Sequence, residues 1–256
     1  MTEPSPEQVH LSVDGPIATI TLDSPGNRNA LSRQLVAELR ACVDEAASDS
    51  AVKALVLTGT GSVFCSGADL REAAQGMAPG GSAFADLLEV LWSLPKIVVV
   101  KLNGHVRAGG LGLVATADIV VAPDDATLAF AEVRIGVAPA MIAVVCVRRM
   151  TPRAVTHYLL TGETFTARDA VGAGLVTIAV PARELDACLS ALLREIRTTE
   201  PNAVAETKKL LGELAGLDVH DGLRHAEEVS GRLFASPEAA EGIAAFREKR
   251  RPAWHV

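Results

Sequence analysis

Two glycine-containing loops carry the residues whose types and spacing could do chemistry. The segments CSGAD (Cys65–Asp69) and RAGGLG (Arg107–Gly112) each follow an apolar run typical of a buried strand, and each leads into a helical pattern. Glycine lets backbone N–H groups approach a ligand closely, and a helix N-terminus adds a positive partial charge. Two such N–H groups that converge on one point would form an oxyanion hole. The residues alone leave open whether the loops converge or are two ordinary tight turns.

The second loop also matches a dinucleotide-binding pattern. Gly110, Gly112 and Ala115 fit GxGxxA, and Glu132 follows about 20 residues later, where that motif has a ribose-binding acid. The context disfavours this interpretation, because residues 103–109 separate the motif from the strand before it. The motif also lies near residue 110, whereas it usually opens its domain.

Cysteine and histidine chemistry is not indicated. Cys65 follows a strand, but a thiolate needs a helix terminus or a base, and nothing links Cys65 to His105, the nearest candidate. We therefore expect Cys65 to be a small buried residue. The four cysteines form no CxxC pair and the six histidines form no HExxH motif, so the sequence predicts no metal site.

The candidate residues belong to a β/α core that is followed by a helical tail. The chain of 256 residues is 49% apolar, which is ample for one large domain. Hydrophobic periodicity and turn residues predict the remaining elements. These are a hairpin over 9–22, a helix from a Ser32 cap to about 48, buried strands within 52–61, 97–102 and 118–122, a helix over 83–94, and a largely helical region after 152.

Composition and charge exclude several classes of protein. The chain has 24 basic and 31 acidic residues and a formal charge of −7, whereas a general nucleic-acid binder needs a basic excess. The longest apolar run, residues 140–147, is far shorter than the ~20 residues of a bilayer span. The N-terminal segment MTEPSPEQVH lacks the apolar region of a signal peptide. We therefore expect a cytoplasmic protein that binds neither nucleic acid nor membrane.

Six segments resemble, in order, those of the enoyl-CoA hydratase/isomerase (crotonase) superfamily. They are SPGNRNALS, VKALVLTGTGSVFCSGADL, NGHVRAGGLGLVATADIVVA, FAEVRIGVAP, LLTGETFTARDAVGAGLV and EGIAAFREKRRPAW. The resemblance covers essentially the whole chain. It implies an α/β fold, with a crotonase-type ββα superhelix over residues 1–195 and a C-terminal helical trimerisation region over 196–256. The implied assembly is a homotrimer or a dimer of trimers.

The resemblance also implies the ligand and the groups that bind it. Members of the superfamily hold the carbonyl of an acyl-CoA thioester between two backbone N–H groups, which by motif position resemble those of Ala68 and Gly109. The positions implied for binding acyl-CoA are Arg28, Ala30, Gly67, Asp69 and Leu70. Among basic residues, Arg28 is the best candidate for the CoA phosphates, and residues 248–251 of a neighbouring subunit are a second one. No cofactor is implied beyond the coenzyme A that the substrate carries.

The catalytic carboxylates depart from the two-glutamate pattern of the family's hydratases. The first glutamate of that pattern lies three residues after the oxyanion glycine, where this chain has Gly112. The second matches Glu132 in AEVRIGVAP, and its other interpretation is a surface carboxylate paired with Arg134 or another base. The segment PAMIAV (139–144) also replaces a glycine-rich PGAGG that many relatives have.

These features resemble a branch similar to methylglutaconyl-CoA hydratases and imply an enzyme with Glu132 as its one catalytic glutamate. Such an enzyme adds water reversibly to a 2-enoyl-CoA in fatty acid or branched-chain acyl-CoA metabolism. A 3-enoyl-CoA to 2-enoyl-CoA isomerase and a non-catalytic acyl-CoA-binding protein are the alternatives. Should Glu132 not be the catalytic residue, Asp69 and Glu72 are the next candidates. Arg107 either reads a carboxylate at the distal end of the acyl chain or is a surface or interface arginine.

Overall fold

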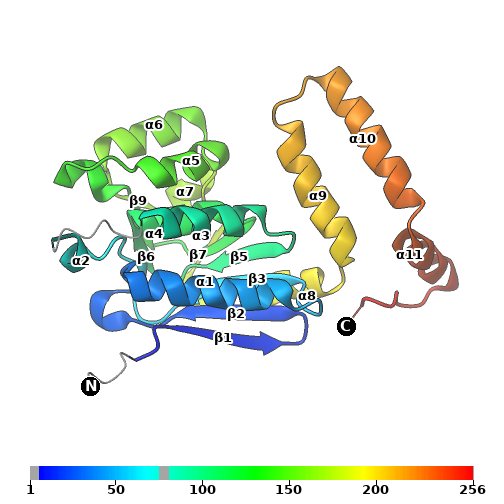
Figure 1. Ribbon diagram of the computed structural model, residues 1–256, viewed down its shortest axis with the longest axis horizontal. Coiled ribbons are helices and arrows are strands. Elements are labelled where there is room, and N and C mark those ends of the chain that lie inside the picture. Colours follow the sequence, from blue (N-terminus) through cyan, green and yellow to red (C-terminus); the bar gives the residue numbers. More distant parts are fainter. Residues whose placement is uncertain (1–5, 75–80, 256) are drawn as a thin grey trace.

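A six-stranded sheet forms the base of the molecule in the computed structural model, which describes residues 6–74 and 81–255 (Figure 1). The strand order is β1-β2-β3-β5-β7-β10. The predicted hairpin is confirmed, because β1 and β2 pair antiparallel, and all other pairs are parallel. The strands are β1 (Val9–Asp14), β2 (Ile17–Leu22), β3 (Ala54–Gly59), β5 (Ile97–Lys101), β7 (Ile119–Pro123) and β10 (Ile178–Val180). Residues 1–5, part of the segment considered for a signal peptide, lie outside the described residues.

Side chains of this sheet alternate between two apolar layers, as the period of a strand requires. In β3, Leu55 and Leu57 face the main core, which includes buried residues of helices α1 (Arg33–Ser48) and α3 (Gly81–Ser93). Ala54 and Val56 face a smaller cluster on the other side, together with residues of α8 (Leu185–Arg197). The large sheet is therefore covered on both faces.

A second, four-stranded sheet lies beside the first and was not predicted. Its order is β4-β6-β8-β9, with the first three strands parallel and β9 antiparallel to β8. The strands are β4 (Val63–Cys65), β6 (His105–Arg107), β8 (Thr127–Ala129) and β9 (Phe165–Thr166). Two or three residues are too few to show an alternating pattern, which explains why the sequence pointed only to loops here.

Several helices flank the two sheets of the core. Ser32 caps α1 as predicted, with its side chain accepting a hydrogen bond from the backbone N–H of Leu35. Helix α4 (Gly109–Thr116) is buried from its second residue to its last, so it is a core helix. The remaining helices of the core are α2 (Leu70–Ala74), α5 (Ala140–Arg149), α6 (Pro152–Thr161) and α7 (Ala167–Ala173). No helix of residues 6–74 and 81–255 is long and apolar enough to cross a membrane.

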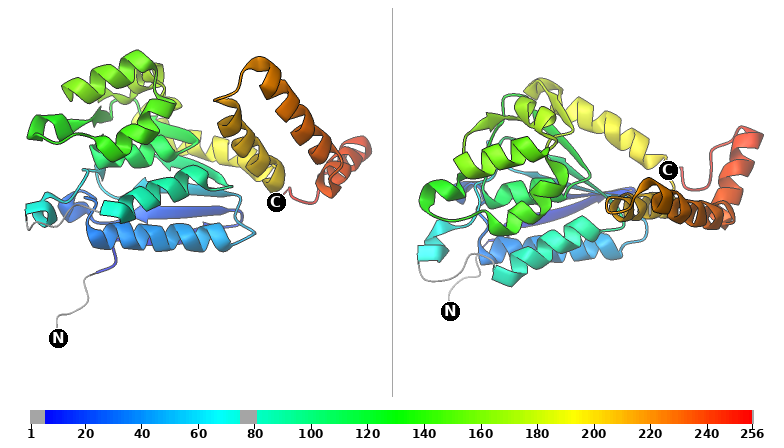
Figure 2. Two further views of the ribbon diagram at one scale, coloured as in Figure 1. Left: turned by 45° about the horizontal axis from the view of Figure 1, so that its top comes forward. Right: turned by 90° about the horizontal axis from the view of Figure 1, so that it is seen from above.

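Three C-terminal helices form an arm that projects from the core (Figures 1 and 2). They are α9 (Pro201–Leu214), α10 (Val219–Phe234) and α11 (Pro237–Glu248). Lys53, at the edge of β3, is only 8% exposed and ties the arm to the core. Its ammonium group donates hydrogen bonds to the carbonyls of Arg197, Thr199 and Trp254, at 2.8, 3.0 and 2.5 Å. One buried cation thus holds both ends of the arm.

Candidate active site

The carboxyl ends of three neighbouring strands bring the predicted site together. Strands β4, β6 and β8 are parallel and adjacent in the small sheet, so their C-terminal ends lie at one edge. The CSGAD loop follows β4, the RAGG loop follows β6, and Glu132 lies three residues beyond β8. This edge of a parallel sheet is where α/β proteins commonly bind ligands. The sheet that the sequence did not predict is therefore the element that assembles the site.

The two glycine loops are in direct contact. Gly67 has φ +90°, and a Cβ added there would lie 2.6 Å from the Cβ of Ala108 and 3.4 Å from the amide nitrogen of Gly109. Only glycine fits this position without strain. Ala108 itself has φ +48°, and its N–H donates to the Ala129 carbonyl at 3.0 Å. The two turns therefore adjoin, which favours the interpretation that their backbone N–H groups converge on one ligand.

The backbone N–H groups of Ala68 and Gly109 are available to a ligand. Within the part of the chain that the structure describes, neither group donates a hydrogen bond, and both residues are partly exposed. Ala68 is fixed by a bridge to Leu31, in which the Leu31 N–H donates to the Gly67 carbonyl at 2.7 Å. Gly109 is the first residue of α4, so the positive end of that helix lies at the same place.

Glu132 is a half-buried carboxylate in a short 3₁₀-helix, η2 (Ala131–Ile135). Its Oε2 atom is buried and has no hydrogen-bond partner among the described residues. Burial raises the pKa of this carboxyl above its ordinary value, and a hydrogen bond from its own backbone N–H opposes the shift. Among the residues that the structure describes, Glu132 forms no ion pair with Arg134 or another base, which disfavours the alternative of a surface ion pair. An unpartnered buried acid is costly for a fold and is typical of a functional group.

The other candidate carboxylates have structural partners. The Oδ1 atom of Asp69 accepts the Arg71 N–H at 2.8 Å, and its Oδ2 accepts a weak bond of 3.4 Å from the Asn27 amide. The Glu72 carboxylate accepts the backbone N–H of Arg33, the first residue of α1, at 3.1 and 3.3 Å. Both acids therefore satisfy backbone donors at helix starts. Of these three carboxylates, Glu132 is the one without a hydrogen-bond partner among the described residues.

The residues predicted to bind coenzyme A lie on two adjoining segments of the chain. The segment 27–31 runs beside the CSGAD loop, with the Ser66 N–H donating to the Arg28 carbonyl at 3.1 Å. Arg28 is exposed at the end of η1 (Pro25–Asn27), with φ +59°. The buried Asn29 side chain anchors the segment through the Thr60 and Val63 carbonyls, at 3.1 and 2.9 Å. The structure therefore brings all five predicted positions, Arg28, Ala30, Gly67, Asp69 and Leu70, to one place.

Arg107 is bound to the small sheet. Its guanidinium donates to the carbonyls of Val106 and Thr127, at 2.8 and 2.5 Å, and to the Thr127 hydroxyl at 2.7 Å. The Nδ1 atom of His105 accepts the Thr127 N–H at 3.0 Å, so His105 shares this cluster and does not pair with Cys65. The structure thus favours a structural arginine that joins β6 to β8.

Gly112, at the place of the missing first glutamate, faces apolar side chains. A Cβ added there would lie 2.5 Å from Cγ2 of Ile142 and 3.4 Å from Cδ2 of Leu88. Ile142 belongs to α5 and Leu88 to α3, and both are buried. No side chain can be added at position 112 without moving Ile142.

The structure gives no support to thiol chemistry at Cys65 or to dinucleotide binding at the GxGxxA pattern. Cys65 is fully buried, and burial raises the pKa of its thiol to about 12, against the opposing effect of the Gly67 N–H. The GxGxxA pattern falls inside the buried helix α4, so it cradles no phosphate. In the described part of the chain, no group of three His, Cys, Asp or Glu residues is placed to hold a metal ion.

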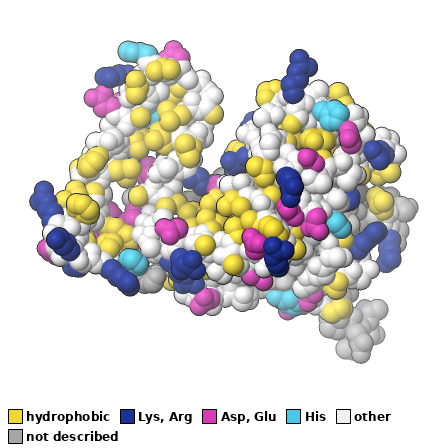
Figure 3. All heavy atoms as spheres, turned by 180° about the vertical axis from the view of Figure 1, so that it is seen from behind, with side chains coloured by type: hydrophobic (Ala, Val, Ile, Leu, Met, Phe, Trp, Pro, Cys, Tyr) yellow, Lys and Arg dark blue, Asp and Glu magenta, His cyan; other side chains and the backbone are white. Residues whose placement is uncertain are grey.

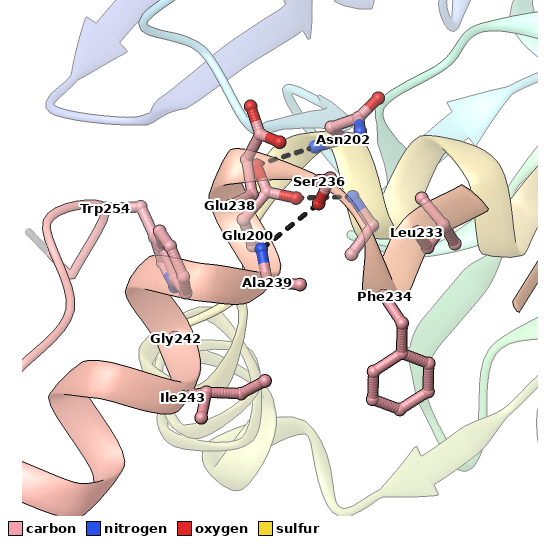
Figure 4. Close-up of a pocket in the computed structure, with 11 residues that line it drawn as sticks. Glu200, Asn202, Leu233, Phe234, Ser236, Glu238, Ala239, Gly242, Ile243 and Trp254 are labelled. Carbon is pink, nitrogen blue, oxygen red and sulfur yellow. Dashed lines mark hydrogen bonds between the residues drawn. The ribbon is translucent and has the colours of Figure 1, made fainter. Parts of the chain in front are cut away.

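Two apolar hollows lie outside the loops. A groove of about 380 Å³ runs between α3 and α5, lined by residues such as Leu88, Trp92 and Val144. A cavity of about 310 Å³ lies in the arm between the α10–α11 turn and the C-terminal tail (Figure 4). There Phe234, Ile243 and Trp254 surround a space that no described residue fills.

Three residues of the site were missed by the sequence interpretation. Leu31 and Phe84 lie 2.8 and 3.7 Å from a Cβ added at Gly109, so they form the apolar surroundings of its N–H. Ile142 is the third. Nothing in the sequence distinguishes Leu31 and Phe84 from other apolar residues. Ile142 could have been found, because it lies in the segment PAMIAV, which departs from the family pattern.

Comparisons with known proteins all point to one family. The family model described as enoyl-CoA hydratase/isomerase matches residues 13–256. A Thermus thermophilus protein with the provisional name enoyl-CoA hydratase is 35% identical, over 93% of this chain and 97% of its own. The carnitinyl-CoA dehydratase of Proteus mirabilis is 31% identical, over 97% of this chain and 98% of its own. A crystal structure of an enoyl-CoA hydratase/isomerase from Marinobacter aquaeolei superposes with a TM-score of 0.90 at 32% identity, covering 98% of this chain and all of that one.

Proposed function

Because the chain belongs to the enoyl-CoA hydratase/isomerase family, we propose that it adds water reversibly to a 2-enoyl-CoA thioester. Family membership confirms the predicted superfamily, the crotonase-type fold and the enzymatic character of the chain. The observation that carries the proposal is the shared edge of β4, β6 and β8. There two available N–H groups and one unpartnered buried carboxylate follow adjacent strands.

The two N–H groups act on the thioester oxygen. The N–H groups of Ala68 and Gly109 hold this oxygen, and the N-terminus of α4 adds positive potential there. As water adds at C3, the electron pair of the C2=C3 bond moves toward the carbonyl, and negative charge grows on the oxygen. The N–H groups therefore bind the transition state more tightly than the substrate, which lowers the barrier.

Glu132 moves the protons. Its carboxylate accepts a proton from the attacking water, whose oxygen bonds to C3. The protonated Glu132 then delivers a proton to C2, which neutralises the enolate and regenerates the carboxylate. A raised pKa suits this exchange, because a group that both takes and returns a proton works best when its pKa lies near the working pH.

Isomerisation of a 3-enoyl-CoA is the second candidate, and the buried Gly112 favours it. With no acid at position 112, Glu132 is the one of the three candidate carboxylates without a hydrogen-bond partner among the described residues, and isomerisation needs one carboxylate to move a proton between two carbons. The same oxyanion hole would serve both reactions. A non-catalytic acyl-CoA-binding protein is the third candidate.

Ultraviolet absorption of the thioester distinguishes the three. Conjugated 2-enoyl thioesters absorb in the ultraviolet, so hydration of crotonyl-CoA removes the band and isomerisation of a 3-enoyl-CoA creates it. We expect loss of the band with crotonyl-CoA. Binding in calorimetry without any spectral change would instead support the binding protein, and no binding to acyl-CoA or CoA would contradict the proposal altogether.

The proposal includes assembly into a trimer or a dimer of trimers through the arm. Large apolar side chains of the arm are exposed, among them Leu223, Phe234 and Phe246, and Phe246 is 85% exposed. Figure 3 shows hydrophobic side chains along the arm and on the neighbouring surface of the core. Exposed apolar surface of this extent is typical of an interface between subunits.

A further inference from the structure

The two departures from the two-glutamate pattern are in contact with each other. Gly112 is buried, and a Cβ there would lie 2.5 Å from Cγ2 and 3.2 Å from Cβ of Ile142. Ile142 is 2% exposed. Its side chain therefore fills the volume into which any side chain at position 112 would project.

The two departures are opposite in size. Counted from Pro139, the position of Ile142 is a glycine in the segment PGAGG, and the two-glutamate pattern has a glutamate at the position of Gly112. The family patterns thus have a small residue on α5 and a large one on α4, and this chain has the reverse. In either combination, one large side chain fills the space between α4 and α5, in keeping with the close packing of protein interiors.

Helix α5 carries this side chain on its buried face. Ile142 and Cys146 lie one turn apart on that face. Burial, and after it the negative charge of Glu132, raises the pKa of the Cys146 thiol to about 12. Cδ2 of Leu88, on α3, lies 3.4 Å from a Cβ added at Gly112. Apolar side chains thus surround the position of the missing acid.

We propose that Ile142 is a specificity-determining residue, which limits the size of the substituents at C2 and C3 of the acyl group. The inference rests on the proposed function. Where a two-glutamate relative has a carboxylate and the water that it holds, the reacting carbons in this chain meet Ile142 and Leu88. The residue should therefore select among acyl groups by volume at these carbons.

A double-mutant cycle tests the packing without any substrate. The four proteins are wild type, G112E, I142A and G112E/I142A, compared by thermal unfolding. We expect G112E to be strongly destabilised and the double variant to be more stable than the sum of the single effects, because I142A removes the 2.5 Å overlap. V145A is the matched control, since Val145 is a buried residue of the same helix that is not among the nearest atoms to Gly112. Additive effects of G112E and I142A would overturn the inference.

Substrate selectivity tests the functional part. We expect I142A to raise the ratio of kcat/KM for a 2-methyl-branched over a linear 2-enoyl-CoA by at least about tenfold, the scale of one methylene in an apolar pocket. V145A should leave this ratio within about twofold. An unchanged ratio in I142A, with hydration retained, overturns the specificity role alone. If the wild type turns over neither compound, the proposed hydration is wrong. Calorimetry then measures the ratio of the binding affinities for the two thioesters, and an unchanged ratio in I142A overturns the specificity role.

Discussion

At the scale of single residues, burial distinguishes Glu132 from the other two candidate carboxylates. Its Oε2 atom is buried and unpartnered, and its pKa is raised, whereas Asp69 and Glu72 bind backbone N–H groups. A neutral Glu132 is cheaper to bury than an ionised one. The free energy of unfolding therefore falls as pH rises through the pKa that Glu132 has in the folded state.

Activity and stability should change in opposite directions with pH. If Glu132 is the base, kcat/KM should rise with pH through an inflection above the ordinary pKa of a glutamate. E132Q should lower the rate by about 10²–10⁴-fold and remove the inflection. E163Q is the control, because the Glu163 carboxylate is exposed and pairs only with His157. A rate for E132Q close to that of the wild type would show that another group moves the protons.

At the scale of elements, the short strands β4, β6 and β8 decide where the chemistry occurs. Each has three residues and ends where a candidate group begins. Their parallel order brings segments near residues 67, 108 and 132 to one edge. The close approach of Gly67 to Ala108 holds the two N–H groups at that edge.

Gly67→Ala should separate the oxyanion loops. The added methyl would lie 2.6 Å from the Ala108 Cβ, and the φ of +90° is unfavourable for alanine. We expect a loss of stability of more than about 1 kcal/mol and a fall in kcat of about 10²–10³-fold, as for a lost oxyanion donor. Gly172→Ala, a helical position with open space, should be neutral or stabilising. Unfolding and turnover of the two variants check this, and normal turnover in G67A would contradict the role of the loop.

Much of the fold and of the site could be predicted from the sequence. The hairpin, the Ser32 cap and the central strands appear as periodicity and turn residues, and the loops and Glu132 appear in motifs. The small sheet could not be predicted, because its strands are too short for a pattern. The contact between Gly112 and Ile142 joins separate segments of the chain, so each departure looked independent.

At the scale of the whole molecule, the arm is attached to the core largely by polar groups. Lys53 holds both ends of the arm, and Lys208 of α9 donates to the Asp118 carboxylate at 2.7 Å. Several large apolar side chains of the arm are exposed, such as Leu223, Phe234 and Phe246. Such a surface is stable in water when another subunit covers it.

Removing apolar surface from the arm should break the assembly. Light scattering of the wild type should give the mass of a trimer or hexamer, and L223D with F246D should give a monomer, because a charge would be buried at the interface. V13D, a matched change at an exposed valine of β1, should keep the mass unchanged. A monomeric wild type at micromolar concentration would contradict the proposed assembly.

The overlap at Gly112 also restricts the order in which such a site can evolve. A glutamate at position 112 would collide with Ile142 unless that side chain moved, so a route that first shortens residue 142 passes through a form with two small residues. That form leaves a void but no collision, and it is the more tolerable intermediate. With Ile142 in place, a glutamate at position 112 is costly as a single substitution. The residues that a lineage can accept at position 112 therefore depend on which residue it has at position 142.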